Sequence, residues 1–204
     1  MHVLMVNGSP RPHGCTYTAL TEIGRVLEEE GITYEIVQVG NKPIRDCIAC
    51  RRCTGNGCVF EDGGVNEFLR KAKEADGFVF GTPVYYAHPS GQLLSFLDRV
   101  FFSANPAIFA GKPGAAIASA RRAGTTASVD VLNKYFTISS MPVVGATYWN
   151  MVHGGSPEEV RQDLEGLQTM RNLGRNMAWM LRQLRSPQAP IPPQEKKVWT
   201  NFIR

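Results

Sequence analysis

Short apolar stretches alternate with amphipathic segments along most of this chain. Apolar side chains at helical spacing predict helices that begin near Thr16, near residue 64, near residue 93 and near residue 129. The apolar stretches between them are too short to be helical and predict five buried strands, at residues 3–6, 33–39, 77–81, 114–119 and 141–145. Because strands connected through helices run parallel, the pattern predicts an α/β fold, a doubly wound five-stranded parallel sheet with helices on both faces.

The C-terminal part of the sequence has two distinct halves. Ser156, followed by a proline and by Glu159, predicts the capped start of a helix that runs to about Leu184. Four prolines between residues 187 and 193 then predict an extended tail, whose aromatic residues would pack against its own subunit or a neighbour. We therefore predict one domain over residues 1–185, with a cysteine-rich insert at about 41–63, and a tail over residues 186–204.

The charge and hydropathy of the 204 residues argue against two classes of protein. The net charge is only +4 and no long block of like charge is present, whereas a nucleic-acid binder gathers Lys and Arg into a patch. No apolar run approaches the roughly 18 residues of a membrane span, and the first residues lack the basic leader of a signal peptide. These features predict a cytoplasmic protein that binds neither nucleic acid nor membrane and has room for a small anionic ligand.

The segment after the first predicted strand combines hydroxyls, an arginine and small residues. In an open parallel sheet, a loop that enters a helix N-terminus at the carboxyl end of a strand binds anions. Ser9, Arg11 and Thr16, with Thr18 and the backbone N–H groups near Gly14, supply the groups that a phosphate requires. The spacing matches neither the dinucleotide fingerprint nor the Walker loop. A capped helix after a proline-containing turn is the alternative interpretation.

Two further loops follow predicted strands and therefore lie at the same edge of the sheet. After the third strand, the backbone and rings of Pro83, Val84, Tyr85 and Tyr86 suit a flat heteroaromatic ring, although half-buried packing is the default role of such tyrosines. After the fourth strand, "SARRAGTT" brings small residues, hydroxyls and two arginines to that edge. Phosphate chemistry beside ring chemistry predicts a bound mononucleotide.

The three loops, "GSPRPHGCT", "GTPVYYAHPSGQLLSFLDR" and "SARRAGTT", resemble the FMN-binding loops of the flavodoxin-like NAD(P)H-dependent FMN reductase family. The resemblance spans most of residues 1–180 and is greatest to the iron–sulfur flavoprotein branch. It implies a flavodoxin-like fold, FMN as the cofactor and NADH or NADPH as the electron donor. The residues that it implies for FMN are Ser9, Arg11, Cys15 and Thr16 at the phosphate, Pro83, Val84, Tyr85 and Tyr86 beside the isoalloxazine, and Ser119, Arg121, Arg122 and Gly124 at its pyrimidine edge.

Cys15 departs from this family, whose members usually carry asparagine at the matching position. A thiol is a weaker hydrogen-bond donor, so Arg11, Thr16 and backbone amides would hold more of the phosphate. A small buried filler is an equal alternative for Cys15. His88 is interpreted as a partly exposed loop residue, and we nominate no catalytic residue because solvent can protonate the reduced flavin.

Four of the five cysteines lie within twelve residues, in "CIACRRCTGNGC". Clustered thiols in a reducing compartment indicate metal or redox chemistry rather than disulfides. One compact turn could present the first three thiolates, as in bacterial ferredoxins, and Gly55 and Gly57 would bend the fourth inward. A four-thiolate zinc site and a motif without metal are the alternatives. The resemblance to iron–sulfur flavoproteins implies a [4Fe–4S] cluster close to FMN, held by Cys47, Cys50, Cys53 and Cys58.

The resemblance also implies an oxidoreductase that uses NADH or NADPH to reduce a quinone, a flavin or another small acceptor. Backbone N–H groups of residues 119–124, with Arg121 or Arg122, would stabilise the negative charge that hydride transfer brings to the flavin. Electrons could also leave singly through the cluster to a ferredoxin-like protein. A non-enzymatic electron carrier is disfavoured because such carriers are acidic, and a cysteine-based redox sensor is a further alternative. Reductases similar to this chain form homodimers or homotetramers, so the same is expected here.

Overall fold

Five parallel strands form the central sheet of the computed structural model, which describes residues 1–53, 55 and 57–185. The strands lie in the order β2–β1–β3–β5–β6, and the antiparallel β4 extends the end of β3 as a hairpin. Their bounds are β1 (His2–Asn7), β2 (Thr33–Gln38), β3 (Gly77–Tyr85), β4 (His88–Pro89), β5 (Gly114–Ala120) and β6 (Met151–His153). The order confirms the predicted doubly wound parallel sheet.

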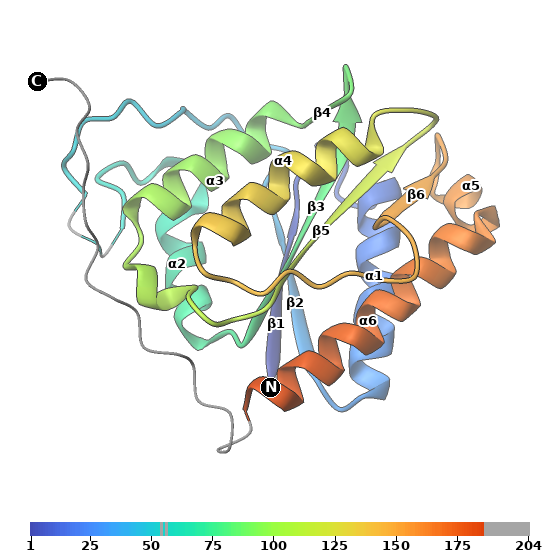
Figure 1. Ribbon diagram of the computed structural model, residues 1–204. Coiled ribbons are helices and arrows are strands. Elements are labelled where there is room, and N and C mark those ends of the chain that lie inside the picture. Colours follow the sequence, from blue (N-terminus) through green and yellow to red (C-terminus); the bar gives the residue numbers. More distant parts are fainter. Residues whose placement is uncertain (54, 56, 186–204) are drawn as a thin grey trace, which may run out of the picture.

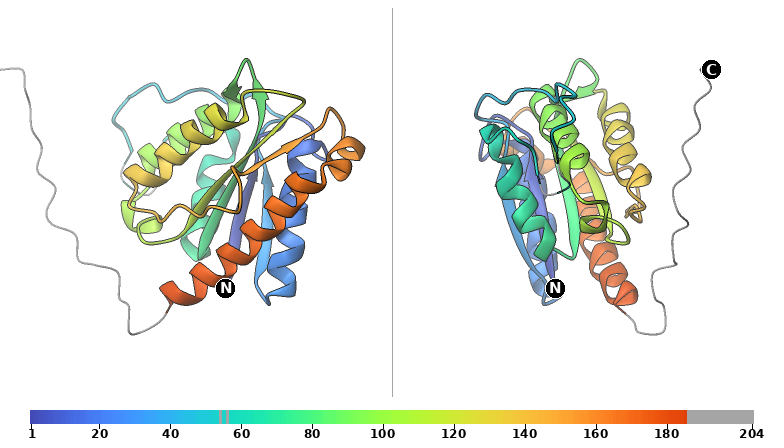
Figure 2. Two further views of the ribbon diagram at one scale, coloured as in Figure 1. Left: turned by 45° about the vertical axis from the view of Figure 1, so that its right-hand side comes forward. Right: turned by 90° about the vertical axis from the view of Figure 1, so that its left-hand side faces the viewer.

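Helices cover both faces of this sheet (Figures 1 and 2). Alternate residues of each strand point to opposite faces, so that in β1 Leu4 and Val6 pack into one core while Val3 and Met5 pack into the other. Burial on both faces explains why the strands are almost continuously apolar. The first core is closed by α2 (Val65–Glu74), α3 (Gly91–Ser103) and α4 (Thr125–Ile138), and the second by α1 (Cys15–Glu29), α5 (Pro157–Gln162) and α6 (Leu164–Leu184).

The edge strand beside β5 differs from the prediction of a strand at residues 141–145. Val143 forms only an isolated bridge with Gly114, and the strand that pairs with β5 is β6. Gly114 of β5 pairs with Val143, and Ala118, four residues later in β5, pairs with Met151. Val143 and Met151 are eight residues apart, so the opposite segment contains an inserted loop between its two pairing positions. The side chain of Asn150 closes this loop by donating to the carbonyl of Val144 at 3.3 Å.

The predicted helix from Ser156 to about Leu184 is divided into α5 and α6. Ser156 caps α5 as expected, since its hydroxyl accepts from the N–H of Glu159 at 3.3 Å. Asp163 then interrupts the helix: its carboxylate accepts from the N–H of Gly166 at 2.9 Å and from the N–H of His153 at 2.6 Å. A carboxylate that caps a second helix and also holds β6 accounts for the break. The predicted tail at 186–204 lies outside the described residues.

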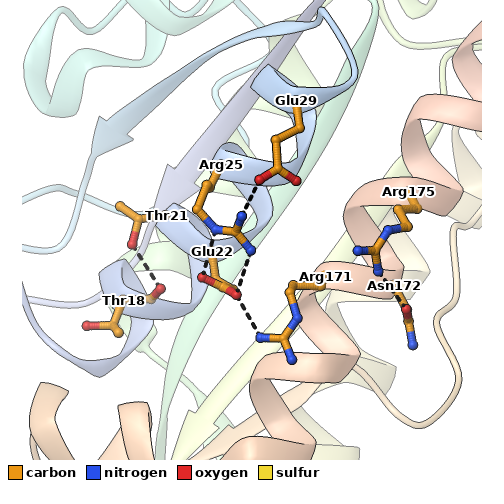
Figure 3. Close-up of polar contacts among 8 residues, drawn as sticks. All are labelled: Thr18, Thr21, Glu22, Arg25, Glu29, Arg171, Asn172 and Arg175. Carbon is orange, nitrogen blue, oxygen red and sulfur yellow. Dashed lines mark hydrogen bonds and ion pairs between the residues drawn. The ribbon is translucent and has the colours of Figure 1, made fainter.

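An ionic network joins α1 to α6 on the outside of the second core (Figure 3). The carboxylate of Glu22 accepts from Arg171 of α6 at 2.8 Å and from Arg25 of its own helix at 3.2 Å, and Arg25 also pairs with Glu29. Burial alone would raise the pKa of Glu22, but the hydrogen bonds and charges of Arg25 and Arg171 lower the pKa below its usual value. The network therefore fixes α1, whose N-terminus lies at the loop after β1.

Replacing Glu22 with glutamine is expected to lower the free energy of unfolding at neutral pH by about 0.2–1 kcal/mol, the range typical of ion pairs at the protein surface. Because the pKa of Glu22 is lower in the folded state than in the unfolded state, its contribution is complete above the unfolded pKa of about 4.3 and is lost as the pH falls through the folded value. Urea unfolding of wild type and Glu22→Gln should give curves that converge at acid pH. A gap that stays constant or widens on acidification would contradict this assignment.

The described part of the chain contains no helix that combines the length and the hydropathy needed to cross a membrane.

Candidate functional site

The loops after β1, β3 and β5 meet at the carboxyl end of the sheet, at the upper end of the strands in Figure 1. The sheet order reverses between β1 and β3, which is the position where doubly wound folds bind ligands. The N–H of Gly8 donates to the carbonyl of Gly81 at 2.9 Å and ties the first loop to β3. A cavity of about 190 Å³ opens among the three loops and the segment after β6.

Nine of the twelve residues that the sequence assigns to FMN line this cavity. They come from the first loop, the end of β3 and the end of β5: Ser9, Arg11, Cys15, Thr16, Pro83, Val84, Tyr85, Ser119 and Arg121. The other three, Tyr86, Arg122 and Gly124, are outside the lining among the described residues. Tyr86 is fully exposed at the tip of the β3–β4 hairpin, and Arg122 is an exposed neighbour of Arg121. Thr18 is likewise turned away, because its hydroxyl donates to the carbonyl of Gly14 at 3.1 Å.

The first loop is held by a pair of amides that the sequence analysis did not single out. The side chain of Asn7, which is fully buried, donates to the side-chain oxygen of Gln38 at 2.7 Å and accepts from the N–H of Ser9 at 3.1 Å. Gln38 in turn donates to the carbonyl of Ser9 at 2.6 Å. The sequence does carry a signal for this contact, because Asn7 ends an otherwise apolar strand and a buried side-chain amide requires hydrogen-bond partners.

Two buried hydroxyls connect the first loop to the loop after β5. The Oγ1 of Thr16 lies 2.7 Å from the Oγ of Ser119, and both residues are almost completely buried. The thiol of Cys15 donates to the carbonyl of Gly154 at 3.6 Å, and burial raises the pKa of this thiol above its usual value. Cys15 is therefore a neutral, packed side chain at the cavity wall rather than a charged group.

The β3–β4 hairpin turns tightly beside the cavity. Tyr86 and Ala87, the two residues of the turn, have φ angles of 50° and 60°, a conformation that favours asparagine and glycine. Thr82 braces the hairpin, because its hydroxyl accepts from the N–H of Ser90 at 2.9 Å and donates to the carbonyl of Pro83 at 2.8 Å. At Gly124 a Cβ atom would lie 2.5 Å from Cα of Ala87, so the loop before α4 packs directly on the hairpin.

Gly154 and Gly155 complete the cavity wall and were missed in the sequence. They directly follow β6. Because the sequence predicted the last strand at residues 141–145, the two glycines were not expected at the carboxyl edge of the sheet, where ligands bind. The two glycines before the helix-capping Ser156 were the signal that could have located them.

The cavity suits a phosphate group because it offers hydrogen-bond donors and a positive charge. Among the described residues no side chain caps α1, so the first N–H groups of this helix stay available beside the hydroxyls of Ser9 and Thr16. Arg11 adds a positive charge at the rim. The cavity volume of about 190 Å³ is below the roughly 300–1,000 Å³ of pockets that enclose a whole ligand. A mononucleotide would therefore insert its phosphate end and leave its ring along the rim at Tyr85.

A larger cavity, of about 610 Å³, lies beside β2 and α2 and shares none of its lining, within the described residues, with the smaller one. Its lining carries more carboxylates than ammonium groups, namely Glu35, Glu61 and Glu67 against Lys42 and Lys71, and Lys71 already pairs with both Glu35 and Glu67. This cavity offers less to an anion than the loops at the carboxyl end of the sheet do.

The cysteine insert at 41–63 packs along α3. Gln92 donates to the carbonyl of Lys42 at 3.1 Å, Ser95 bonds to Asp46, and the N–H of Gly57 donates to the carbonyl of Ser103 at 3.2 Å. All five cysteines, each within the described residues, are free and partly exposed. The insert therefore runs from the N-terminus of α3, which follows the β3–β4 hairpin, to its C-terminus.

The thiols of the insert fit an iron–sulfur cluster by the chemistry of their donor atoms. Burial raises the pKa of the Cys53 thiol, and the neighbouring thiols of Cys58, Cys50 and Cys47 raise it further, so the four sulfur atoms influence one another. Ala49 and Arg51, between the first three cysteines, have φ angles of 52° and 54°, the left-handed conformation that also occurs in backbone nests for anions. In the part of the chain that the structure describes, no three His, Cys, Asp or Glu side chains are grouped closely enough to hold a metal ion.

Comparison with known proteins gives consistent results. The family model described as NADPH-dependent FMN reductase matches residues 1–156. An iron–sulfur flavoprotein of Methanocaldococcus jannaschii is 35% identical over 193 residues, which cover 91% of this chain and 100% of the relative. Among solved structures, a flavone reductase has a TM-score of 0.70 and 19% sequence identity, and the match covers 90% of this chain and 64% of the reductase chain. An archaeal flavodoxin has a TM-score of 0.61 and 16% identity, and the match covers 89% of this chain and 99% of the flavodoxin chain.

The two structures establish the fold, and the family model and the relative establish the family, so that the strand order, the three loops and the comparisons agree. The chain belongs to the NADPH-dependent FMN reductase family and is an NAD(P)H-dependent flavoprotein oxidoreductase with a flavodoxin-like fold.

Proposed function

We propose that this chain binds FMN with its phosphate in the cavity after β1 and uses NADPH or NADH to reduce a quinone, a flavin or another small acceptor. The observation that carries the proposal is the junction of three strand-end loops around one cavity with an uncapped helix N-terminus. When bound, FMN would supply the hydride acceptor and the subsequent electron donor.

The phosphate would be held by the first loop. The N–H groups at the start of α1 and the hydroxyls of Ser9 and Thr16 are the donors, and Arg11 supplies the full positive charge. Thr16 is pre-positioned by Ser119, and Ser9 by Asn7 and Gln38, so little ordering is required when the ligand binds.

The ring would lie between the end of β3 and the loop after β5. Pro83, Val84 and Tyr85 form one wall, and Ser119 with Arg121 forms the edge where negative charge would develop during reduction. Tyr86 is fully exposed at the hairpin tip, where its ring could cover the outer face of the flavin. The chain needs no side chain that transfers a proton, since this rim is open to solvent.

Replacing Arg11 with glutamine is expected to weaken FMN binding by about tenfold, because a charge-assisted hydrogen bond to a phosphate contributes about 1.5–3 kcal/mol and Arg11 is exposed. Riboflavin, which lacks the phosphate, should bind both forms equally, and high salt should narrow the difference for FMN. The measurement is a fluorescence titration of the apoprotein with each flavin.

Lys134→Gln serves as the control, because it removes one exposed positive charge on α4 away from the cavity. An equal loss of FMN and riboflavin affinity in Arg11→Gln, or no loss of either, would rule out the phosphate role.

We also propose that Cys47, Cys50, Cys53 and Cys58 hold a [4Fe–4S] cluster that passes single electrons to a ferredoxin-like protein. The mutual influence of the four thiols and the name of the archaeal relative support this role.

Free thiols on every cysteine favour a reducing compartment, consistent with the cytoplasm. A homodimer or homotetramer is proposed from the exposed aromatic side chains of Tyr148 and Trp149.

A further inference from the structure

A buried arginine on α3 joins the two stems of the cysteine insert. The guanidinium of Arg99, whose side chain is 1% exposed, donates to the carbonyl of Phe60 at 2.8 Å, to the carboxylate of Asp62 at 3.0 Å and to the carbonyl of Arg45 at 3.4 Å. Arg45 precedes the four cysteines and the other two residues follow them. One rigid fork on a core helix therefore holds both ends of the loop that carries the thiols.

The positive charge at this junction exceeds the negative charge that faces it. Asp62 pairs with Arg99 and also with Arg45, at 3.6 Å, so one carboxylate faces two guanidinium groups. Among the described residues no hydrogen-bond partner meets the buried Nε of Arg99. A buried donor that lacks a partner favours a further hydrogen-bond acceptor beside it, and next to a guanidinium group a negatively charged acceptor is the strongest.

Cys58 is the thiol that lies beside this guanidinium. Its backbone is fixed on both sides by Asn66 of α2, which accepts from the N–H of Cys58 at 2.8 Å and donates to its carbonyl at 2.8 Å. At Gly57 the φ angle is 136° and a Cβ atom would lie 2.5 Å from the amide oxygen of Asn66, so a side chain there would displace this contact. Cys58 is thus firmly attached to the core next to a positive charge.

We infer that Arg99 is a positioning residue for the cysteine insert: its fork holds both stems against α3, and its charge favours a set of bound thiolates that includes Cys58. The fork and the charge are separable, because lysine keeps the positive charge but replaces the wide planar guanidinium group with one compact ammonium group. The fork concerns the insert alone, whereas the effect of the charge rests on the cluster proposed above, and neither depends on where FMN binds.

The fork is tested by limited trypsin digestion of the full-length, FMN-loaded protein, which can be cut after the exposed Arg51 and Arg52. Arg99→Met and Arg99→Lys should both be cleaved there at least tenfold faster than wild type, whereas Arg70→Met, which removes an exposed arginine of α2, should be cleaved at the wild-type rate. If Arg99→Met does not fold, Asp62→Asn replaces it, since it removes the carboxylate between the stems and should also accelerate cleavage. Unchanged cleavage in the variants that fold would overturn the positioning role.

The charge is tested by iron and acid-labile sulfide content after anaerobic reconstitution, followed by a potentiometric titration of the cluster. Arg99→Met should shift the one-electron reduction equilibrium about tenfold toward the oxidised cluster, which corresponds to 59 mV, while Arg99→Lys should stay within threefold of wild type. If Arg99 had a purely structural role, the reduction equilibrium of the cluster would be unchanged in both variants or shifted equally in both. Either result would overturn the proposed effect of the charge. Wild-type protein that takes up no iron and sulfide would overturn it as well.

FMN affinity is measured in the same samples. Wild-type affinity in every Arg99 variant is the expected result and separates this test from that of the flavin site. A loss of FMN affinity as large as the change in cleavage would contradict an action confined to the insert.

Discussion

Replacing Gly40 with alanine is expected to weaken FMN binding about 100-fold, although Gly40 does not line the cavity. A Cβ atom at this position would lie 2.4 Å from the backbone carbon and 2.5 Å from the carbonyl oxygen of Ser9, and 2.7 Å from the carbonyl oxygen of Gly8. All three are main-chain atoms of the proposed phosphate loop, so no side-chain rotation relieves the overlap. The loop must move away from Gly40, which breaks the bond from Gln38 to Ser9 and displaces the donors.

Gly145→Ala is the matched control, because a Cβ atom there meets open space in the described structure. Both variants are compared with wild type by titration with FMN and by circular dichroism. The expected pattern is a folded Gly40→Ala protein with strongly weakened binding and a Gly145→Ala protein that binds normally. Normal FMN affinity in a folded Gly40→Ala protein would show that the first loop does not hold the ligand.

Replacing Phe80 with alanine is expected to lower the free energy of unfolding by about 3–5 kcal/mol. Phe80 is fully buried in the middle of β3, and its ring centroid lies 5.0 Å from that of Phe136, 6.1 Å from that of Phe101 and 6.4 Å from that of Phe68. Rings from α2, α3 and α4 therefore meet on this one side chain, and no single helix can move to fill the void. A loss of this size is a large part of the roughly 5–15 kcal/mol of a typical domain.

Phe102→Ala is the control for this stability prediction, because Phe102 is on α3 but is 58% exposed. Urea denaturation of the apoproteins should show a change within about 0.5 kcal/mol for Phe102→Ala. If Phe80→Ala costs no more than the control does, the aromatic cluster is not the centre of the first core.

The sequence was sufficient for the central strands and for the side chains that follow them. In β1, β3 and β5 the apolar runs are bounded by loops rich in glycine, proline and hydroxyls, and burial on both faces leaves few other folds for such runs. The proximity of Thr16 and Ser119 followed from topology alone, because parallel strands end at one edge.

The edge of the sheet was less predictable because its residues are decided by tertiary contacts. The segment at 141–145 is as apolar as a strand, yet Met151–His153 takes the pairing positions once the intervening loop is closed by Asn150. Asp163 likewise caps a helix only because β6 brings the N–H of His153 to its carboxylate. The role of Arg99 was hidden for the same reason, since its partners lie 37 to 54 residues away in the chain.

A crystal structure of the FMN complex tests the location of the flavin most directly. Phosphate oxygens are expected at hydrogen-bond distance, about 2.7–3.2 Å, from Thr16 and the first N–H groups of α1, with the ring against Tyr85. FMN bound instead in the larger cavity beside β2 and α2, with the first loop empty, would contradict this location.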